Sequence, residues 1–545
     1  KDVSFSDLRI LFPLFIIFLL VVFFLFFKNV AGVMMPLSIV IITNLATLGL
    51  AGLFDIKVVT ITFVIPIILM AIGIADSIHI LEYFFNNYHS SGNKRDALEK
   101  TLDKNLWPTF LTSLTTTIGF FSLMTADLVP IREMGMICGI GVMFAWFFSF
   151  VVIVPYCLYV PIKKRDIHNR DDFRIKTANW FLSFIISHRN KIIFFFCALT
   201  ILMIGLGLTN RINSNPYQNF AEHLPVRKAN DFFLKKIGGL NGPQILIDSG
   251  KEDGIYQPEF LKKVDELQSW LNSMDEINNV SSILNVLKQT NRALNGGGND
   301  QYKIPTSSQA VAEQVFLYGL SVPEGKSLNN LVTMDKRKLR MSILWTIQDS
   351  VSGTHEMEII MKKAQEIGLN ATITGKVALT QLMVGKVIKI FIVSLATSVT
   401  FICLIFFVLF KDFKIGLISL LPNILPIAFT SGVLVLIGQD IDFTIAISSC
   451  ICLGIAVDDT IHFIGHYIRL KDMPTEEALG EIFRSTGSGL VLTTIVLVAG
   501  FGIFLFADFI PNRNFGILTA SSLFIALVAD LLLLPALFLL KKSRV

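Results

Sequence analysis

A long apolar run near the C-terminal end of this 545-residue chain contains the stretch Gly454-Ile455-Ala456-Val457-Asp458-Asp459-Thr460-Ile461-His462. The run extends from about Phe443 to Tyr467, which is long enough to cross a bilayer at roughly 20 residues per helix. A charge at the centre of such a helix costs at least ~2.5–3.5 kcal/mol, and ionisable residues there usually have a function. The two aspartates and the histidine are therefore the first candidates for a functional site.

The same motif occurs a second time, 383 residues earlier in the chain. The stretch Ala71-Ile72-Gly73-Ile74-Ala75-Asp76-Ser77-Ile78-His79 aligns with the first without a gap. This alignment pairs Asp76 with Asp459, Ser77 with Thr460, and His79 with His462. It also pairs Ala75 with Asp458, so the two copies are unequal in charge.

The composition is that of a polytopic membrane protein. Hydrophobic residues make up 53% of the chain and charged residues 16%, whereas a soluble chain has about a quarter charged residues. Because the apolar residues are concentrated in long runs, the net charge of +5 is informative only through where the basic residues fall. We expect the protein to interact with the membrane and not with nucleic acid.

Eleven helices are predicted to span the membrane. They fall at about 10–27, 33–53, 61–84, 107–126, 134–160, 190–209, 387–410, 415–437, 443–467, 489–507 and 515–540. A basic cytoplasmic loop is expected over 161–189, and a large polar block over 210–386. With this block outside, the short inside segments carry 21 Lys and Arg residues and the outside loops carry three. The positive-inside rule then predicts an outer polar block and a cytoplasmic C-terminus.

The duplication extends beyond the aspartate motif. At an offset of 381 residues, Ala126-Asp127-x-x-Pro130-x-Arg132 aligns with Ala507-Asp508-x-x-Pro511-x-Arg513. Residues 10–160 and 387–540 are therefore predicted to be two copies of one five-helix unit, in parallel orientation about an axis along the membrane normal, as transporters use. Because only the second copy follows a helix and an outer domain, we expect one helix and one outer domain to be missing before Lys1.

The polar block is predicted to be an α/β domain outside the membrane. Residues 244–248 and 339–347 have strand character, and the second stretch partly alternates between apolar and polar residues. Apolar residues at helical spacing follow Pro258 as far as Leu271, and 355–367 has a similar pattern.

The duplicated polar residues are suited to moving protons. On an α-helix, Asp76 and His79 lie on one face, as do Asp459 and His462, with Asp458 beside them. Burial raises the pKa of a carboxylic acid toward neutrality, and histidine titrates in the same range. We therefore predict a proton relay of Asp76, His79, Asp458, Asp459 and His462, supported by the hydroxyls of Ser77, Thr460, Thr116 and Thr493. The alternative is a buried polar network that only fixes the helix register.

Metal and cofactor chemistry is not expected. The pair His462-x-x-x-His466 has Phe463 where a zinc hydrolase helix has glutamate. All six cysteines fall in apolar runs, which argues against an aqueous metal site. We expect neither an enzyme nor a bound cofactor.

The duplicated motif, the outer α/β domain and the later Asp508-x-x-Pro511 resemble the resistance-nodulation-division superfamily, and within it the MMPL-like exporters. The five-helix unit is also similar to a sterol-sensing domain. This resemblance implies export of hydrophobic or lipid-like substrates from a bacterial inner membrane, driven by the proton-motive force, with a porter-like periplasmic domain. By position, Asp76, Asp458 and Asp459 match the proton-relay carboxylates of that family.

Two features depart from the family's pattern. Ser77 and Thr460 stand where lipid exporters commonly have tyrosine, and no Lys or Arg lies mid-helix as in the drug-efflux branch. Lipid transport is therefore favoured over drug efflux. Two alternatives stay open, a lipid-sensing or sterol-sensing protein without turnover and an accessory subunit of protein secretion. Partners compatible with the sequence are a hydrophobic molecule or lipid, further copies of the chain, or a periplasmic protein.

Overall fold

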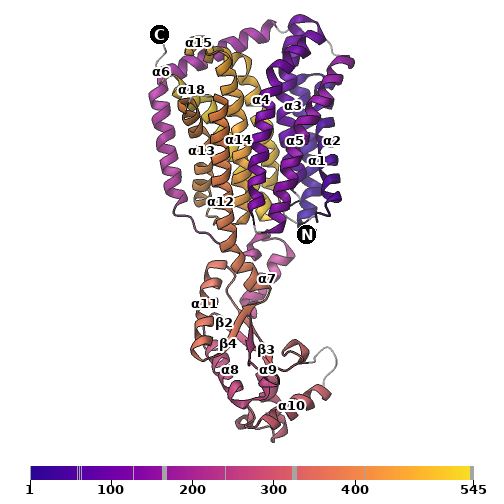
Figure 1. Cartoon of the computed structure of the whole chain (residues 1–545), viewed down its shortest axis with the longest axis vertical. Helices are drawn as coiled ribbons and strands as arrows, with labels where there is room; N and C mark the ends of the chain where they lie inside the picture. The colour runs from indigo at the N-terminus through magenta and orange to yellow at the C-terminus, as the bar shows by residue number, and fades with distance from the viewer. Residues whose placement is uncertain are drawn as a thin grey trace. The chain divides into compact units, whose positions relative to one another are not determined.

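The computed structural model describes residues 2–57, 59, 62, 64–126, 128–161, 168–239, 241–321, 328–410 and 413–540 (Figure 1). It divides into a helical unit, residues 1–211 and 387–545, and a smaller unit, residues 212–386. Asp127 of the repeat, residues 162–167 of the expected basic loop, and the basic C-terminal end 541–545 lie outside the described residues.

The first repeat forms five long helices in the helical unit. They are α1 (Asp2–Phe27), α2 (Val30–Leu53), α3 (Ile65–Ser91), α4 (Lys94–Ser122) and α5 (Val129–Tyr159). Asn93 caps α4 by accepting hydrogen bonds from the backbone N–H groups of Arg95 and Asp96. The helix therefore begins well before the expected span at 107–126, and its first three turns extend toward the cytoplasmic side in our orientation.

Helix α6 (His168–Gly207) corrects one prediction. We expected a basic loop over 161–189 followed by a spanning helix over 190–209, but one 40-residue helix covers most of both. Its apolar part, Ile175–Gly207, is long enough to cross a membrane. We predicted a loop over 161–189 because the segment is rich in basic residues. Lys and Arg indicate the side of the membrane on which a segment lies, but they do not end a helix.

The second repeat forms the remaining helices of this unit. They are α12 (Lys376–Phe410), α13 (Phe413–Leu436), α14 (Phe443–Arg469), α15 (Thr475–Ser485), α16 (Gly487–Gly502), α17 (Ile510–Val528), a π-helical turn (Ala529–Leu533) and α18 (Leu534–Phe538). The boundary between the two units falls inside α12. Pro535 lacks an N–H group, which favours an interrupted helix just before it.

Eight helices among the described residues are long and apolar enough to cross a membrane. The chain is therefore a multi-pass helical membrane protein, while the count of eleven spans stays a prediction. Helices α4 and α14 are not among the eight. Helix α4 begins with a charged segment and is rich in Thr, and α14 carries adjacent aspartates.

The two repeats pack against each other mainly through two pairs of helices. Helix α3 contacts α16, and α14 contacts α4. The second pair is visible in Figure 1, where the orange α14 lies beside the purple α4. In an 18-residue apolar stretch of α3, 94% of the residues are buried, whereas in the corresponding stretch of α1 only 22% are. Helix α3 is therefore central and α1 peripheral. A methyl group added at Gly454 would lie 3.4 Å from the Cα of Thr116, which shows how closely α14 approaches α4. Small residues at such crossings allow close helix packing in a membrane.

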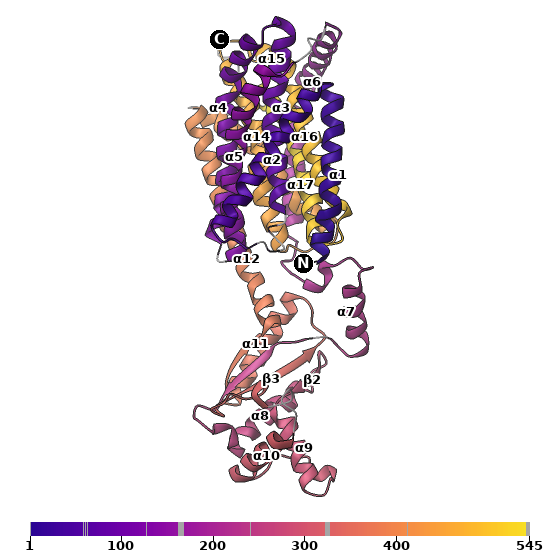
Figure 2. The same cartoon turned by 90° about the vertical axis from the view of Figure 1, so that its right-hand side faces the viewer.

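The smaller unit has a four-stranded antiparallel sheet in the order β2-β3-β1-β4, covered by helices (Figure 2). Strands β1 (Gln244–Asp248) and β3 (Lys338–Trp345) alternate between buried and half-buried residues, so one face lies on the core. The other elements are α7 (Pro225–Lys236), α8 (Pro258–Leu271), β2 (Ile277–Ser281), α9 (Ile283–Leu294), α10 (Ser308–Ser321), α11 (Ser350–Glu366) and β4 (Asn370–Thr374). Strand β2 was not predicted from the sequence.

Candidate functional site

The two repeat-related aspartates have equivalent surroundings. Asp76 on α3 accepts a hydrogen bond from the hydroxyl of Ser113 on α4, at 3.2 Å. Asp459 on α14 accepts one from the hydroxyl of Thr494 on α16, at 3.1 Å. Ser113 and Thr494 are themselves 381 residues apart, so the same bond is made once in each repeat. Asp76, Ser113 and Thr494 are buried among the membrane helices.

The repeat-related histidines contact each other directly. The rings of His79 and His462 stack with their centroids 4.2 Å apart and their planes 25° apart. Both side chains are nine-tenths buried or more. The Nε2 atom of each has no hydrogen-bond partner among the described residues. This contact joins α3 to α14 at one point between the repeats.

Asp458, and not Asp459, forms a close pair with His462 among the described residues. The Nε2 atom of His462 lies 3.5 Å from Oδ1 of Asp458, one helical turn away. Asp459, which we expected on the same helix face as His462, accepts its hydrogen bond from Thr494 on the neighbouring helix. The Asp458–His462 pair has no counterpart in the first repeat, where Ala75 occupies the equivalent position.

The four predicted supporting hydroxyls divide into two groups. Ser77 and Thr493 donate to carbonyls of their own helices, at Gly73 and Gly489, so the structure does not place them on the carboxylates as expected. Thr116 and Thr460 do connect different helices. Thr116 donates to the carbonyl oxygen of Gly454 at 2.9 Å, across the contact between the repeats.

Asp530 is a buried carboxylate that was not predicted from the sequence. It lies in the π-helical turn after α17 and is 1% exposed. The hydroxyl of Thr460 donates to its Oδ1 at 2.7 Å, and the amide of Asn423 on α13 donates to Thr460 at 3.2 Å. Because a charge inside a membrane-spanning helix is costly, an aspartate within the last apolar run could have been singled out in the same way as Asp458. It was overlooked because the repeat comparison selects duplicated positions, and its equivalent is Ser149.

The carboxyl groups form an interacting set. The charge of Asp458 acts on Asp76 across the repeat contact and on Asp459 beside it, and the charge of Asp530 also acts on Asp459. Among the described residues, none of these four aspartates forms an ion pair with Lys or Arg, and the basic group beside Asp458 is His462. Several like charges so close together and away from water cannot all be ionised without a large electrostatic cost. The set is therefore suited to hold protons and to release them.

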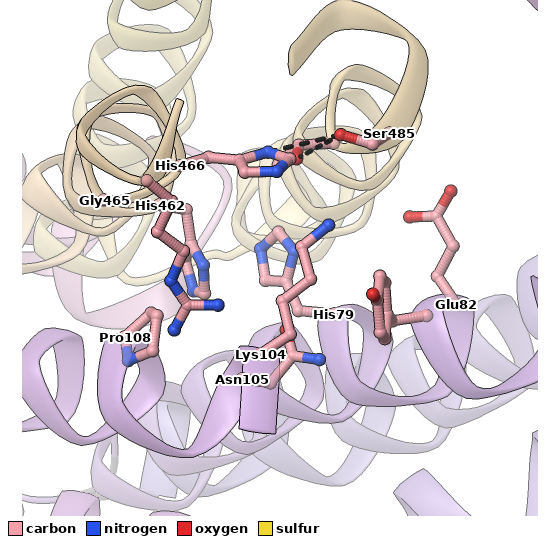
Figure 3. A pocket seen from close by; sticks show the side chains of 12 residues that line it. His79, Glu82, Lys104, Asn105, Pro108, His462, Gly465, His466 and Ser485 are labelled. Carbon is pink, nitrogen blue, oxygen red and sulfur yellow. Dashed lines mark hydrogen bonds between the residues drawn. The ribbon is translucent and has the colours of Figure 1, made fainter. Parts of the chain in front are cut away.

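A small polar cavity lies next to the stacked histidines (Figure 3). Its volume is about 40 Å³, and a buried water needs only roughly 10–15 Å³ by this measure. Figure 3 shows the rings of His79 and His462 next to each other in its wall, with His466 hydrogen-bonded to Ser485. The ionisable groups of the wall are His79, Glu82, Tyr83, Lys104, His462, His466 and Arg469.

Lys104 lies in the N-terminal part of α4, before the span predicted at 107–126. Its ammonium group is 4.2 Å from the centre of the Tyr83 ring. Burial, and secondarily the nearby Arg469, lower the pKa of Lys104 to about 8, against the opposing effects of Glu82 and Glu481. A lysine with such a pKa exchanges its proton near physiological pH.

The spaced histidines, His462 and His466, do not belong to a metal-ligand cluster in the described part of the chain. Among the described residues, no three His, Cys, Asp or Glu side chains form a group that could hold an ion. His466, the second histidine of the spaced pair, instead shares a hydrogen bond between its Nδ1 atom and the hydroxyl of Thr486, at 2.9 Å.

Comparison with known proteins identifies the family to which the chain is similar. The family model of the MMPL family matches residues 1–174 and 260–544, which include both aspartate helices. A protein of Methanocaldococcus jannaschii, described simply as a membrane protein, is 23% identical over 378 residues. The aligned part covers 64% of this chain and 92% of that relative.

Proposed function

The chain belongs to the MMPL family, and we propose that it is a proton-driven exporter of lipid-like or hydrophobic molecules in a bacterial inner membrane. Family membership makes it a transporter-like membrane protein. The proton coupling, the class of substrate and the orientation, with the α/β unit in the periplasm, are our proposal. The orientation is supported by the distribution of Lys and Arg.

One observation carries this proposal. Each repeat brings an aspartate to an equivalent hydroxyl donor, and the repeat-related histidines meet between them. A network that only fixed the helix register would not need four carboxyl groups where apolar side chains pack as well. Intramembrane ionisable residues in a bundle interior are typical of proton pathways in transporters.

The geometry supports a path in steps. A proton held among Asp76, Asp459 and Asp458 reaches the histidines through the Asp458–His462 pair, whose atoms are 3.5 Å apart. A closure of about half an ångström would make this contact a hydrogen bond. From His462 the proton reaches the small cavity, whose wall also includes Lys104 and Arg469. This side corresponds to the cytoplasm in our orientation.

Movement follows from the change in charge. Protonation of Asp76 or Asp458 removes the repulsion between α3 and α14, so it favours a closer contact of the repeats. Deprotonation favours separation. A substrate with different affinities for these two arrangements would be coupled to the proton flow, because a ligand shifts an equilibrium only by its differential affinity.

The test is proton-driven transport in proteoliposomes. We expect an imposed proton gradient to drive movement of a fluorescent lipid in the wild type, and Asp459→Asn and Asp76→Asn to abolish it while the protein stays folded. Asp7→Asn is the matched control. Asp7 is a buried aspartate of α1 that accepts backbone hydrogen bonds from Asp508 and Phe509, away from the relay.

Two outcomes would contradict the proposal. Transport by Asp459→Asn at the wild-type rate would exclude its role in coupling. Lipid binding without any gradient-driven movement would instead favour the lipid-sensing alternative.

A further inference from the structure

An apolar groove lies on the outside of α16, in the same unit as the relay. It has a volume of about 490 Å³, which is within the range of roughly 300–1,000 Å³ that ligand pockets have. Helices α1, α6, α15 and α16 form its walls. The apolar side chains that matter most here are Phe26, Phe181, Phe483, Val491 and Ile495.

Helix α16 separates this groove from the relay. Val491 and Ile495 line the groove and are 37% and 51% exposed. Thr494 is buried and donates to Asp459. Gly489 is also buried, and a methyl group added there would lie 3.2 Å from Nδ1 of His79. One short helix thus has the groove on one side and both relay motifs on the other.

Two further residues connect the groove wall to the polar site. Ser488 lines the groove, and its hydroxyl donates to Glu82, which lines the cavity beside His79. Leu531 lines the groove and directly follows Asp530 in the π-helical turn. A molecule that fills the groove therefore touches residues adjacent to the relay at two places.

The groove has one charged side chain among its described lining residues, Arg484. It stands at the end of α15, where its guanidinium group donates to Asn179 of α6 at 2.8 Å. The rest of the wall is almost entirely apolar. An apolar slot with a single cation at its end is complementary to an acyl chain with an anionic headgroup. In our orientation Arg484 lies on the cytoplasmic side, where the leaflet contains anionic lipids.

We propose that this groove binds an anionic acyl lipid of the cytoplasmic leaflet, and that the bound lipid sets the position of α16 against the relay. The acyl chain lies along Val491 and Ile495, and the headgroup contacts Arg484. The effect on transport rests on the proposed proton-driven function, whereas the binding does not. An occupied groove holds Gly489 and Thr494 against His79 and Asp459, so an anionic lipid is expected to increase proton-coupled transport.

The binding is tested directly with dioleoylphosphatidylglycerol and dioleoylphosphatidylcholine. Native mass spectrometry of the full chain in detergent counts the lipids that stay bound. We expect Ile495→Trp, which fills the groove, to abolish preferential phosphatidylglycerol binding, and Arg484→Gln to weaken it severalfold. Ile201→Trp is the matched control, because Ile201 is a 72% exposed side chain on α6 that does not line the groove.

A second measurement relates binding to transport. Proton-driven flux in proteoliposomes is measured at increasing phosphatidylglycerol content, with the same variants. We expect flux to rise with phosphatidylglycerol in the wild type and in Ile201→Trp, and to be insensitive to it in Ile495→Trp.

The outcomes separate this inference from the proposed function. Equal binding of the two lipids by the wild type, or preferential binding kept by Ile495→Trp, would overturn the lipid site. Flux that depends on Asp459 but not on phosphatidylglycerol would overturn its effect on α16 and leave the proposed function intact. Groove-dependent binding without any proton-driven flux would support the lipid site and refute the proposed function.

Discussion

His79 and His462 are 383 positions apart in the chain, yet their rings stack at a centroid distance of 4.2 Å. They are equivalent residues of the two repeats, so each repeat contributes one half of a contact on the axis that relates them. Two stacked imidazolium ions would repel each other at this distance. The pair can therefore hold one added proton far more readily than two, and it is a natural point for a proton to pass between the repeats and the cavity.

Replacing His462 by phenylalanine separates the stacking role of this residue from its proton chemistry. We expect His462→Phe to unfold at nearly the wild-type temperature, because an aromatic ring is kept, and to lower gradient-driven proton flux by roughly 100-fold. His462→Leu should lower the proton flux and also lower the free energy of unfolding by about 0.5–1.5 kcal/mol, because the aromatic pair is removed. Unfolding in detergent and dye-reported flux in vesicles measure the two effects. Wild-type flux in His462→Phe would show that the ring only packs.

The polar chain that ends at Asp530 gives a comparison between the repeats. In Thr460→Val, Asp530 and Asn423 each lose a buried hydrogen-bond partner, which should cost about 1–3 kcal/mol in free energy of unfolding. Ser77→Ala removes the equivalent hydroxyl of the first repeat, which, within the described part of the chain, bonds only to its own helix at Gly73. We expect this change to cost less than about 1 kcal/mol. Reversible denaturation in mixed micelles measures both, and equal costs would contradict the assigned network.

The duplicated motif predicted the polar helices well because charge in an apolar run is costly and therefore informative. Asp76, His79, Asp458 and His462 lie together in one region, as expected from their shared depth on two parallel repeats. The pairing of side chains was harder to predict. Positions three and four residues away both neighbour a given residue on a helix, so the sequence alone does not decide whether His462 faces Asp458 or Asp459.

Contacts between helices could not be predicted from a single sequence. Ser113 and Thr494 contact the aspartates while Thr116 and Thr493 bond to backbone carbonyls, a difference set by helix rotation that composition does not reveal. Asp530 was missed for another reason. Comparing the repeats selects positions where they agree, whereas the second repeat carries extra carboxyl groups at the equivalents of Ala75 and Ser149.

The close approach of α16 to α3 depends on Gly489. A methyl group there would lie 2.5 Å from Oε2 of Glu82 and 3.2 Å from Nδ1 of His79. Gly489→Ala should therefore push the Glu82 carboxylate and the His79 ring away from α16, with a cost of about 1–3 kcal/mol from overpacking, and reduce proton-driven flux. Gly502→Ala is the control, since that glycine ends the same helix with open space around it. There we expect a neutral or slightly stabilising change. Thermal unfolding and flux of both variants test this, and identical behaviour would refute a tight contact at Gly489.

The titration of Lys104 reports the electrostatics of the cavity from outside the membrane span. Its pKa is lowered to about 8, so competitive amine labelling followed by mass spectrometry should show half-maximal reactivity near pH 8. A lysine in water ordinarily reaches this point near a pH of about 10.4. Lys100 provides an internal reference for the labelling, because it lies one turn earlier on the same helix, paired with Asp96 at the surface.

Two neighbours should move the Lys104 midpoint in opposite directions. Arg469 disfavours the protonated lysine, so Arg469→Gln removes a positive charge and should raise the midpoint above pH 8. Glu82 favours the protonated form, so Glu82→Gln should lower it. Burial lowers the pKa of Lys104 in the wild type and in both variants, which keeps each midpoint below that of a lysine in water. A midpoint that both substitutions shift in the same direction, or that neither shifts, would mean that these charges do not meet at the cavity, and that the proposed outlet for protons on this side is incorrectly placed.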